Sequence, residues 1–274
     1  MLKGLYITDV NNQTIPSDAI NLVNNTELDL REVDGLGRPD AELYTQEKVA
    51  VDASFYSGQT VKSRTITLSV KTKNDLYRMV LYRMLGYNDK RRIFVETDAG
   101  VYWIDGYVKG ATYAAKPAAR QEIEIPIFCP YPWFRSARRH KRLVMLNKRN
   151  TVYDCCNNGD IQAGIQIYST EGSDLMVRNL FASAGNNTVK FSTAIPTFYT
   201  EQTLLDTTPG NHTIAGGWRG VSPSDITITG GMPVLNPGVS QLIEVEVTAD
   251  GANPIESIEN AECLLSWYDT WSGI

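Results

Sequence analysis

The segment from Gln121 to Phe134, QEIEIPIFCPYPWF, constrains the fold of this chain more than any other. Three isoleucines between residues 123 and 127 alternate with polar residues, which is the period of a strand with one buried face. Pro130 and Pro132 then each remove a backbone N–H and fix φ, so a regular strand cannot continue through them. We therefore expect the last strand of one domain, followed by a stiff apolar exit. The junction residues are Cys129, Pro130, Pro132, Trp133 and Phe134.

Charge divides the chain at the same place. Residues 134–150 carry seven bases and no acid, whereas residues 151–274 carry three bases and 14 acids. We interpret residues 1–134 as a first domain, 135–150 as a basic linker and 151–274 as a second domain, and a length of 274 residues suits two domains.

The basic linker allows two interpretations. It is either a nucleic-acid patch, or a segment that contacts an acidic surface of its own chain or of a neighbouring subunit. We prefer the second interpretation, because no stacking aromatic residues are interleaved with the bases of the linker past Phe134, and the acidic second domain would repel a polyanion. A sequence-specific nucleic-acid partner is therefore not expected.

The sequence also limits the compartment. No window approaches 18 apolar residues, and the first residues, MLKGLYITDV, lack the layout of a signal peptide. We expect no membrane partner, and a product that stays in the cytoplasm or leaves it inside an assembly. None of the four cysteines forms a CxxC pair, so we expect buried free thiols and no metal site.

The first domain has strand patterns with a single helix pattern. The helix is expected between a capping Asn74 and a terminating Gly86. These patterns predict a mainly β domain, two layers thick, with the helix packed on its sheet. The expected strands are 2–9, 27–33, 49–56 (with a turn at Ser57-Gly58), 64–72, 91–97, 101–108 and the first half of 121–134.

A turn-rich stretch at residues 33–48 is longer than a hairpin connection needs. Long loops in compact domains usually carry function, so we interpret this stretch as an arm that contacts a neighbouring subunit. The candidate contact residues are Asp34, Gly35, Arg38 and Glu42.

The second domain consists of short apolar alternations separated by Gly, Asn and Pro turns, such as 161–169, 188–194, 242–248 and 262–268. Many short strands without a helical period predict a β-sandwich of jelly-roll type.

The sequence contains no catalytic motif among those with a known spacing. The sequence has no GxGxxG, GxxxxGK[ST], HExxH or GxSxG motif, and no spacing singles out a carboxylate pair for glycoside hydrolysis. We expect no enzyme activity and no cofactor. Sugar binding stays open as an alternative, since small sandwiches often stack sugars on exposed aromatic residues. Trp218 and Tyr199 are candidates, together with Trp267, Tyr268 and Trp271.

The order of several motifs resembles the distal tail (Dit) proteins of siphoviruses, the bacteriophages with long non-contractile tails. The strongest match is CPYPWF at 129–134, similar to the Cys-Pro-x-Pro-aromatic-Phe step that ends the first domain in that family. Weaker matches follow in the family's order. They are DGLGRPD, SRTITLSV, NNGDIQAGIQIYS, LLDTTPGNHTI, VLNPGVSQLIEVEV and LLSWYDTWSGI.

The resemblance implies a structural role in the virion tail tip. The first domain would be a tail-tube-like domain that forms a homo-hexameric ring. The ring would join the tail tube protein to the tail hub or tail-associated lysin, after assembly in the bacterial host cytoplasm. The second domain would be an outward galectin-like or carbohydrate-module-like sandwich that carries receptor-binding proteins in some phages.

Overall fold

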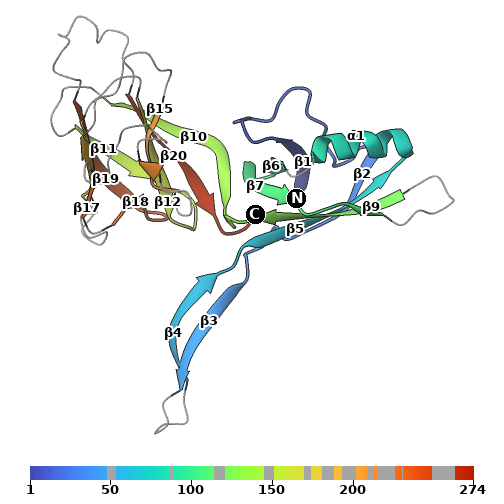
Figure 1. The fold of residues 1–274 in the computed structure, drawn as a ribbon, viewed down its shortest axis with the longest axis horizontal. Helices are drawn as coiled ribbons and strands as arrows, with labels where there is room; N and C mark the ends of the chain where they lie inside the picture. The colour runs from blue at the N-terminus through green and yellow to red at the C-terminus, as the bar shows by residue number, and fades with distance from the viewer. Residues whose placement is uncertain are drawn as a thin grey trace, which may run out of the picture. The chain divides into compact units, whose positions relative to one another are not determined.

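The computed structural model describes residues 1–47, 54–86, 89–113, 121–144, 151–169, 174–180, 188–192, 202–208, 213–214, 226–229, 231–248 and 263–274. These residues form antiparallel strands and one helix (Figure 1). They divide into two compact units, residues 1–137 with 271–274, and residues 138–270. The chain passes from one unit to the other within β10 (Phe134–Val144) and returns within β20 (Cys263–Trp271). The predicted mainly β fold is confirmed.

The first unit is an antiparallel sheet of short and long strands, with one helix packed on it. Its sheet has the order β7-β9-β5-β2, with β6 on β7, β1 on β6 and β8 on β9. The elements are β1 (Leu2–Asp9), β2 (Leu28–Asp34), β3 (Ala41–Glu47), β4 (Ser54–Val61), β5 (Arg64–Thr72), α1 (Asp75–Leu85), β6 (Lys90–Thr97), β7 (Val101–Val108), β8 (Thr112–Tyr113) and β9 (Gln121–Cys129).

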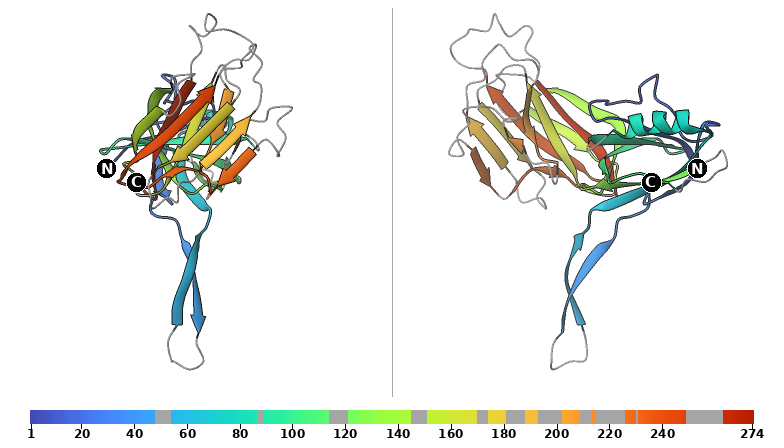
Figure 2. Two further views of the ribbon diagram at one scale, coloured as in Figure 1. Left: turned by 90° about the vertical axis from the view of Figure 1, so that its left-hand side faces the viewer. Right: turned by 45° about the vertical axis from the view of Figure 1, so that its right-hand side comes forward.

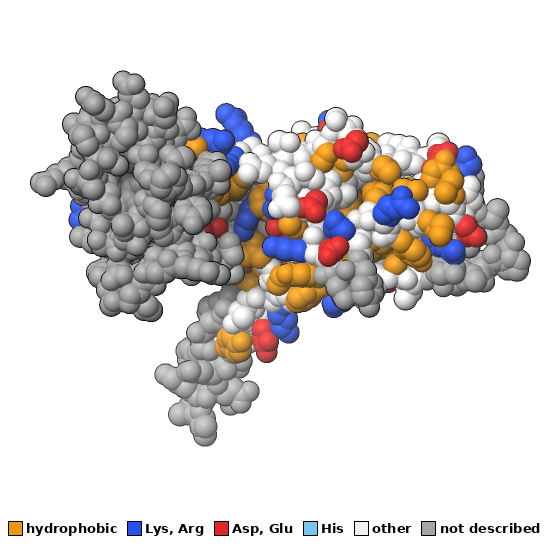
Figure 3. Space-filling model, turned by 45° about the horizontal axis from the view of Figure 1, so that its top comes forward, with side chains coloured by type: hydrophobic (Ala, Val, Ile, Leu, Met, Phe, Trp, Pro, Cys, Tyr) orange, Lys and Arg blue, Asp and Glu red, His pale blue; other side chains and the backbone are white. Residues whose placement is uncertain are grey.

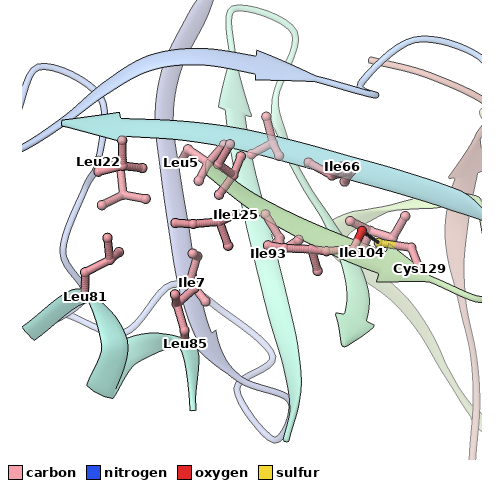
Figure 4. Packing of buried hydrophobic residues seen from close by; sticks show 14 of the residues in the cluster. Leu5, Ile7, Leu22, Ile66, Leu81, Leu85, Ile93, Ile104, Ile125 and Cys129 are labelled. Carbon is pink, nitrogen blue, oxygen red and sulfur yellow. Dashed lines mark hydrogen bonds between the residues drawn. The ribbon is translucent and has the colours of Figure 1, made fainter. Parts of the chain in front are cut away.

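The core of the first unit is built on the pairing of β5 with β9. Ile66 lies opposite Ile127 and Leu68 opposite Ile125, and these four side chains are fully buried. Figure 4 shows Ile66 and Ile125 among core residues from β1, β6, β7 and α1. Burial of each such side chain contributes about 1.5–3 kcal/mol relative to exposure, so the alternation in the sequence is sufficient to orient both strands.

Helix α1 forms where the sequence predicts it. The Asn74 side chain accepts a hydrogen bond from the Tyr77 N–H (3.2 Å), and Gly86 ends the helix with a φ of 67°. Leu81 and Leu85 are buried beneath it. Leu76, in the first turn of the helix, is 65% exposed.

The predicted loop at 33–48 is confirmed only at residues 35–40, and the predicted turn at Ser57-Gly58 is wrong. Of the strand expected at 49–56, residues 54–56 are in a strand. The structure has a two-stranded hairpin of β3 and β4, in which Gly58 lies opposite Tyr44 within the ladder instead of in a turn. The Gly and Ser residues suggested a break, but in a two-stranded ribbon neither face is buried, so small residues interrupt nothing. Residues 48–53 lie outside the described part of the chain.

The junction also differs from the prediction. The prolines do interrupt the chain, but β10 then pairs with β7 at Arg135 and Ser136, so β9 is not the last strand of this unit. Residues 135–144, expected in the linker, belong to a strand, and the rest of the linker, 145–150, lies outside the described residues. The sequence pattern of β10 does not indicate a strand, because five of its eleven residues are Lys or Arg. The guanidinium groups of Arg139 and Arg142 lie over aromatic rings.

The second unit has two antiparallel sheets, as the sequence predicts for a sandwich. One sheet has the order β16-β15-β12-β20-β10, with β18 paired to β12. The other has the order β11-β19-β13-β14-β17 (Figure 2). Ile165, Ile167 and Trp267 are buried on the first sheet, and Ile243 and Val245 on the second. The remaining strands are β11 (Thr151–Cys156), β12 (Ala163–Ser169), β13 (Asp174–Asn179), β14 (Thr188–Ser192), β15 (Gln202–Asp206), β16 (Thr213–Ile214), β17 (Ile226–Thr229), β18 (Val234–Leu235) and β19 (Ser240–Thr248).

Within the described ranges, no helix has the length and hydropathy to cross a bilayer.

Candidate subunit-contact site

The β3–β4 hairpin, called the arm below, leaves the first unit as a separate ribbon (Figures 1 and 2). Its two strands pair with each other and with no other strand of the described structure. Leu43 and Tyr44 are exposed on it, at 61% and 46%. An isolated two-stranded hairpin is marginally stable in water, so an arm of this kind gains stability from a partner surface.

Arg64 anchors the base of the arm. It opens β5 and is only 4% exposed. Its Nη1 donates to the carbonyl oxygen of Gly35 (2.9 Å), and its Nη2 donates to the carbonyl oxygen of Ser272. The guanidinium lies over the ring of Phe134, 4.6 Å from the centroid. One buried cation therefore joins the arm base, the junction and the segment after β20.

The backbone at this anchor has little room. Gly35 has a φ of 84°, and a Cβ there would lie 2.3 Å from the carbonyl oxygen of Thr65. Gly273 packs on Gly37, and the Ile274 N–H donates to the carbonyl oxygen of Leu36 (3.1 Å). Residues 271–274 thus hold the loop between β2 and the arm against the sheet.

Burial controls the titration of two groups here. Removal of water lowers the pKa of the Arg64 guanidinium to about 10, with an opposing effect from Cys129. Burial raises the pKa of the Cys129 thiol to about 12, although Arg64 acts in the other direction. At neutral pH the anchor is therefore a cation beside a neutral thiol, and the charge strengthens its hydrogen bonds to the two carbonyls.

A second basic cluster supports the junction from the side of β7. Arg92 forms a two-point ion pair with Asp105 (2.7 and 3.1 Å) and lies over the ring of Trp103, 3.7 Å from the centroid. Arg135 lies 4.8 Å from the centroids of Trp103 and of Tyr131. The Trp103 ring is thereby in contact with two guanidinium groups, which fixes the path of the chain after the prolines.

The other predicted junction residues line the same turn. Cys129 ends β9 and is buried, Pro130 is exposed, Pro132 is buried and Trp133 is half-buried. Phe134 begins β10 and is fully buried against Arg64.

The four predicted arm residues are spread over the arm and its base. Asp34 ends β2, Gly35 and Arg38 lie in the loop that follows, and Glu42 lies in β3. The anchor brings Gly35 into direct contact with β5, whereas Arg38 and Glu42 are exposed.

Arg64 and Ser272 are not among the residues predicted for this site. A signal for Arg64 was present. It has the same parity as Ile66, Leu68 and Val70, so the strand pattern places its side chain on the buried face. No comparable signal marked Ser272, which contributes only a backbone carbonyl.

In the second unit, the basic residues of β10 bind groups of their own unit. Arg139 donates to the Ser266 hydroxyl (2.8 Å) and lies 4.4 Å from the ring centroid of Tyr168. His140 stacks on Trp267 (centroids 5.0 Å apart) with its Nε2 3.1 Å from Asp269. Own-chain groups, aromatic as well as acidic, therefore occupy this stretch.

The sugar-binding candidates have different outcomes. Trp267 is 1% exposed, and Trp271 packs edge-on against Tyr102 with centroids 6.1 Å apart, so neither ring is open for stacking. Trp218 and Tyr199 lie outside the described residues. Among the described residues, no three His, Cys, Asp or Glu side chains are grouped so as to hold a metal ion.

Comparison with known proteins agrees with this architecture. No family model matches the sequence, and no curated protein matches it. Solved structures do match over nearly the whole chain. The Dit protein of phage SPP1, described as a paradigm of the hub adsorption apparatus in phages that infect Gram-positive bacteria, has a TM-score of 0.58 at 12% identity, covering 98% of this chain and 99% of that chain.

Two structures of the phage P2 baseplate in its activated conformation also match. The one with Ca has a TM-score of 0.53 at 10% identity, covering 97% of this chain and 98% of that chain. The one with Sr has a TM-score of 0.51 at 9% identity, covering 96% and 97%. At these identities the comparison shows a shared fold, and this fold includes both units.

Proposed function

We propose that the chain is a structural protein of a phage tail tip, without enzyme activity. Six copies would form a ring that joins the tail tube protein to the tail hub or tail-associated lysin and carries adsorption proteins. The observation that carries this proposal is the end-to-end match of both units to a phage Dit protein and to a phage baseplate chain. The motif order that resembles distal tail proteins supports it independently.

The arm supplies a physical reason for ring formation. A closed ring needs a heterologous interface, in which one surface of each copy binds a different surface of the next copy. The arm exposes apolar side chains and two strands without outside partners, and β2 is the last strand of its sheet on that side. Both features leave backbone groups and apolar surface for another copy to cover.

The two units would divide the work. Residues 1–134 would form the ring, residues 135–150 the basic connection, and residues 151–274 the outward domain, to which receptor-binding proteins attach. The protein would be located at the virion tail tip after assembly in the host cytoplasm. Sugar binding through Trp218 and Tyr199 stays a prediction for the outward domain.

Light scattering on the purified chain, followed by negative-stain electron microscopy of the same peak, tests the proposal. We expect a mass of six copies and rings with six outward lobes. A chain that stays monomeric at every concentration, both alone and mixed with purified tail-tube protein, would overturn the ring. Incubation with host cell-wall and capsule glycans should release no sugars, and a carboxylate-dependent hydrolysis would contradict the non-enzymatic role.

A further inference from the structure

Helix α1 carries an apolar stripe that its own unit does not cover. Leu76 and Met79 are 65% and 64% exposed, and they lie three residues apart on one face. Arg83 continues this face by one more turn and is also exposed. Figure 3 turns the α1 side of the first unit toward the viewer and shows apolar side chains there next to lysine and arginine side chains.

The stripe leads into a pocket of about 490 Å³ at the end of the helix. Leu85, Val108 and Ala111 give it apolar walls, and Arg83 and Lys109 contribute positive charge to its lining. We refer to the stripe and this pocket together as the α1 surface.

The pocket exists because the sheet is interrupted beside it. Pro126 has no N–H to donate, and only its carbonyl is used, by the Lys109 N–H (2.9 Å). Strand β7 pairs with β9 as far as Val108, and β8 resumes the pairing at Thr112. The loop between them therefore stands away from the sheet.

The arm has the complementary chemistry. It exposes Leu43 and Tyr44, together with the acids Asp40 and Glu42 near its base. Glu42 is paired with Lys62 at 3.5 Å, but both side chains are more than half exposed. Such surface pairs contribute about 0–1 kcal/mol, so the carboxylate is free to exchange this lysine for a base on another molecule.

We propose that the arm of one copy binds the α1 surface of the next copy, with its leucine and tyrosine on the stripe and pocket and its acids beside Arg83 and Lys109. This inference rests on the proposed ring and names the surface that receives the arm. In Figures 1 and 2, α1 lies on one face of the β5–β9 sheet and the arm leaves from the other side, so the arm of the same chain points away. A contact between two different surfaces of successive copies is the type that closes a ring.

Mixed crosslinking between two variants, each with one exposed cysteine added to the four native ones, tests the contact directly, and the parent chain gives the background from the native thiols. A His-tagged Leu43→Cys chain is mixed with an untagged Met79→Cys chain, allowed to assemble, and treated with a bismaleimide. Both residues are exposed, so the substitutions should not disturb folding, which circular dichroism checks. We expect a covalent dimer that contains one chain of each kind. The matched control uses an untagged Leu242→Cys chain in place of the Met79→Cys chain, since Leu242 is an exposed apolar position of the second unit. This control should give no covalent dimer.

A charge test complements the crosslink. Arg83→Glu should weaken self-association by roughly tenfold, and Glu42→Arg in the same chain should restore part of the loss. If rings form but residues 43 and 79 never crosslink and Arg83→Glu assembles normally, the inference is wrong and the ring proposal stands. If no assembly of several copies forms in any mixture, both are wrong. If the α1 surface becomes covered only when tail-tube or hub protein is added, it binds that partner and the inference is wrong.

Discussion

Arg64 donates a hydrogen bond to the carbonyl oxygen of Gly35 across 2.9 Å, and thereby connects the start of β5 to the base of the arm 29 residues earlier in the chain. The same guanidinium reaches Ser272, more than 200 residues later. A buried cation with two backbone carbonyls as partners costs free energy to desolvate, so its presence indicates that the geometry of the arm base matters.

Replacement of this anchor should loosen the arm base. Arg64→Lys keeps the charge but cannot span both carbonyls, and an unsatisfied buried carbonyl costs about 1–3 kcal/mol. We expect a lower melting temperature and faster hydrogen exchange at residues 35–38. Arg31→Lys, an exposed base that pairs with Asp29, is the control and should change little. Equal exchange at the arm base in both variants would mean that Arg64 does not hold it.

Gly35 should not tolerate a side chain. Gly35→Ala combines a left-handed backbone, which costs about 1–2 kcal/mol, with a Cβ placed 2.3 Å from the Thr65 carbonyl oxygen. We expect loss of stability in urea denaturation and weaker ring assembly. Gly37→Ala is a matched control two residues away, because a Cβ there meets nothing within 4 Å. If both variants behave alike, the close approach at Gly35 is unimportant.

Arg92 and Asp105, the ion pair next to Trp103, should stabilise the fold only when both are present. Asp105→Asn leaves Arg92 without its carboxylate at about 10% side-chain exposure, and loss of one partner of a largely buried pair costs on the order of 3 kcal/mol. Arg92→Met in the same chain should recover part of this loss, which a double-mutant cycle of thermal denaturation measures. Asp98→Asn removes an exposed carboxylate and should have a much smaller effect. Strictly additive losses would argue against coupling.

The two buried thiols should be unreactive until the chain unfolds. Burial raises the pKa values of Cys129 and Cys155 to about 12, so neither forms thiolate at pH 8. Iodoacetamide should label them only in denaturant, with half-buried Cys156 as the more reactive control. Because the folded pKa lies above the ordinary value of 9.0, stability should be constant below about pH 9 and fall as the pH rises toward 12. Rapid native labelling of Cys129 would contradict its burial.

Arg139 should stabilise the second unit through its aromatic contacts. Arg139→Glu removes the hydrogen bond to Ser266 and places a carboxylate against the Tyr168 and Tyr268 rings. We expect faster proteolysis near the junction and a loss of about 1–3 kcal/mol. Lys141→Glu reverses an exposed charge on the same strand and should digest like the parent chain. If the Arg139→Glu chain is digested at the same rate as the parent chain, Arg139 does not stabilise the second unit.

The regular elements could be predicted from the sequence because each one has a repeating pattern with one buried side. Strand β5 and helix α1 have the predicted positions, since their apolar spacing and the cap at Asn74 act within a few residues. The arm and β10 could not be predicted in this way. The arm side chains whose burial is described, at 41–44 and 60–61, are exposed or half-buried, and β10 has basic residues where a strand pattern would have apolar ones.

By itself, then, the sequence determined a mainly β chain of two parts with a proline step between them, because backbone restriction and periodicity are local properties. Only the tertiary structure decided that residues 271–274 return to the first unit, that Arg64 joins Gly35 to Ser272, and that residues 108–111 line a pocket with the end of α1. These features depend on contacts between residues far apart in the chain, and such contacts leave no spacing in the sequence from which they can be predicted.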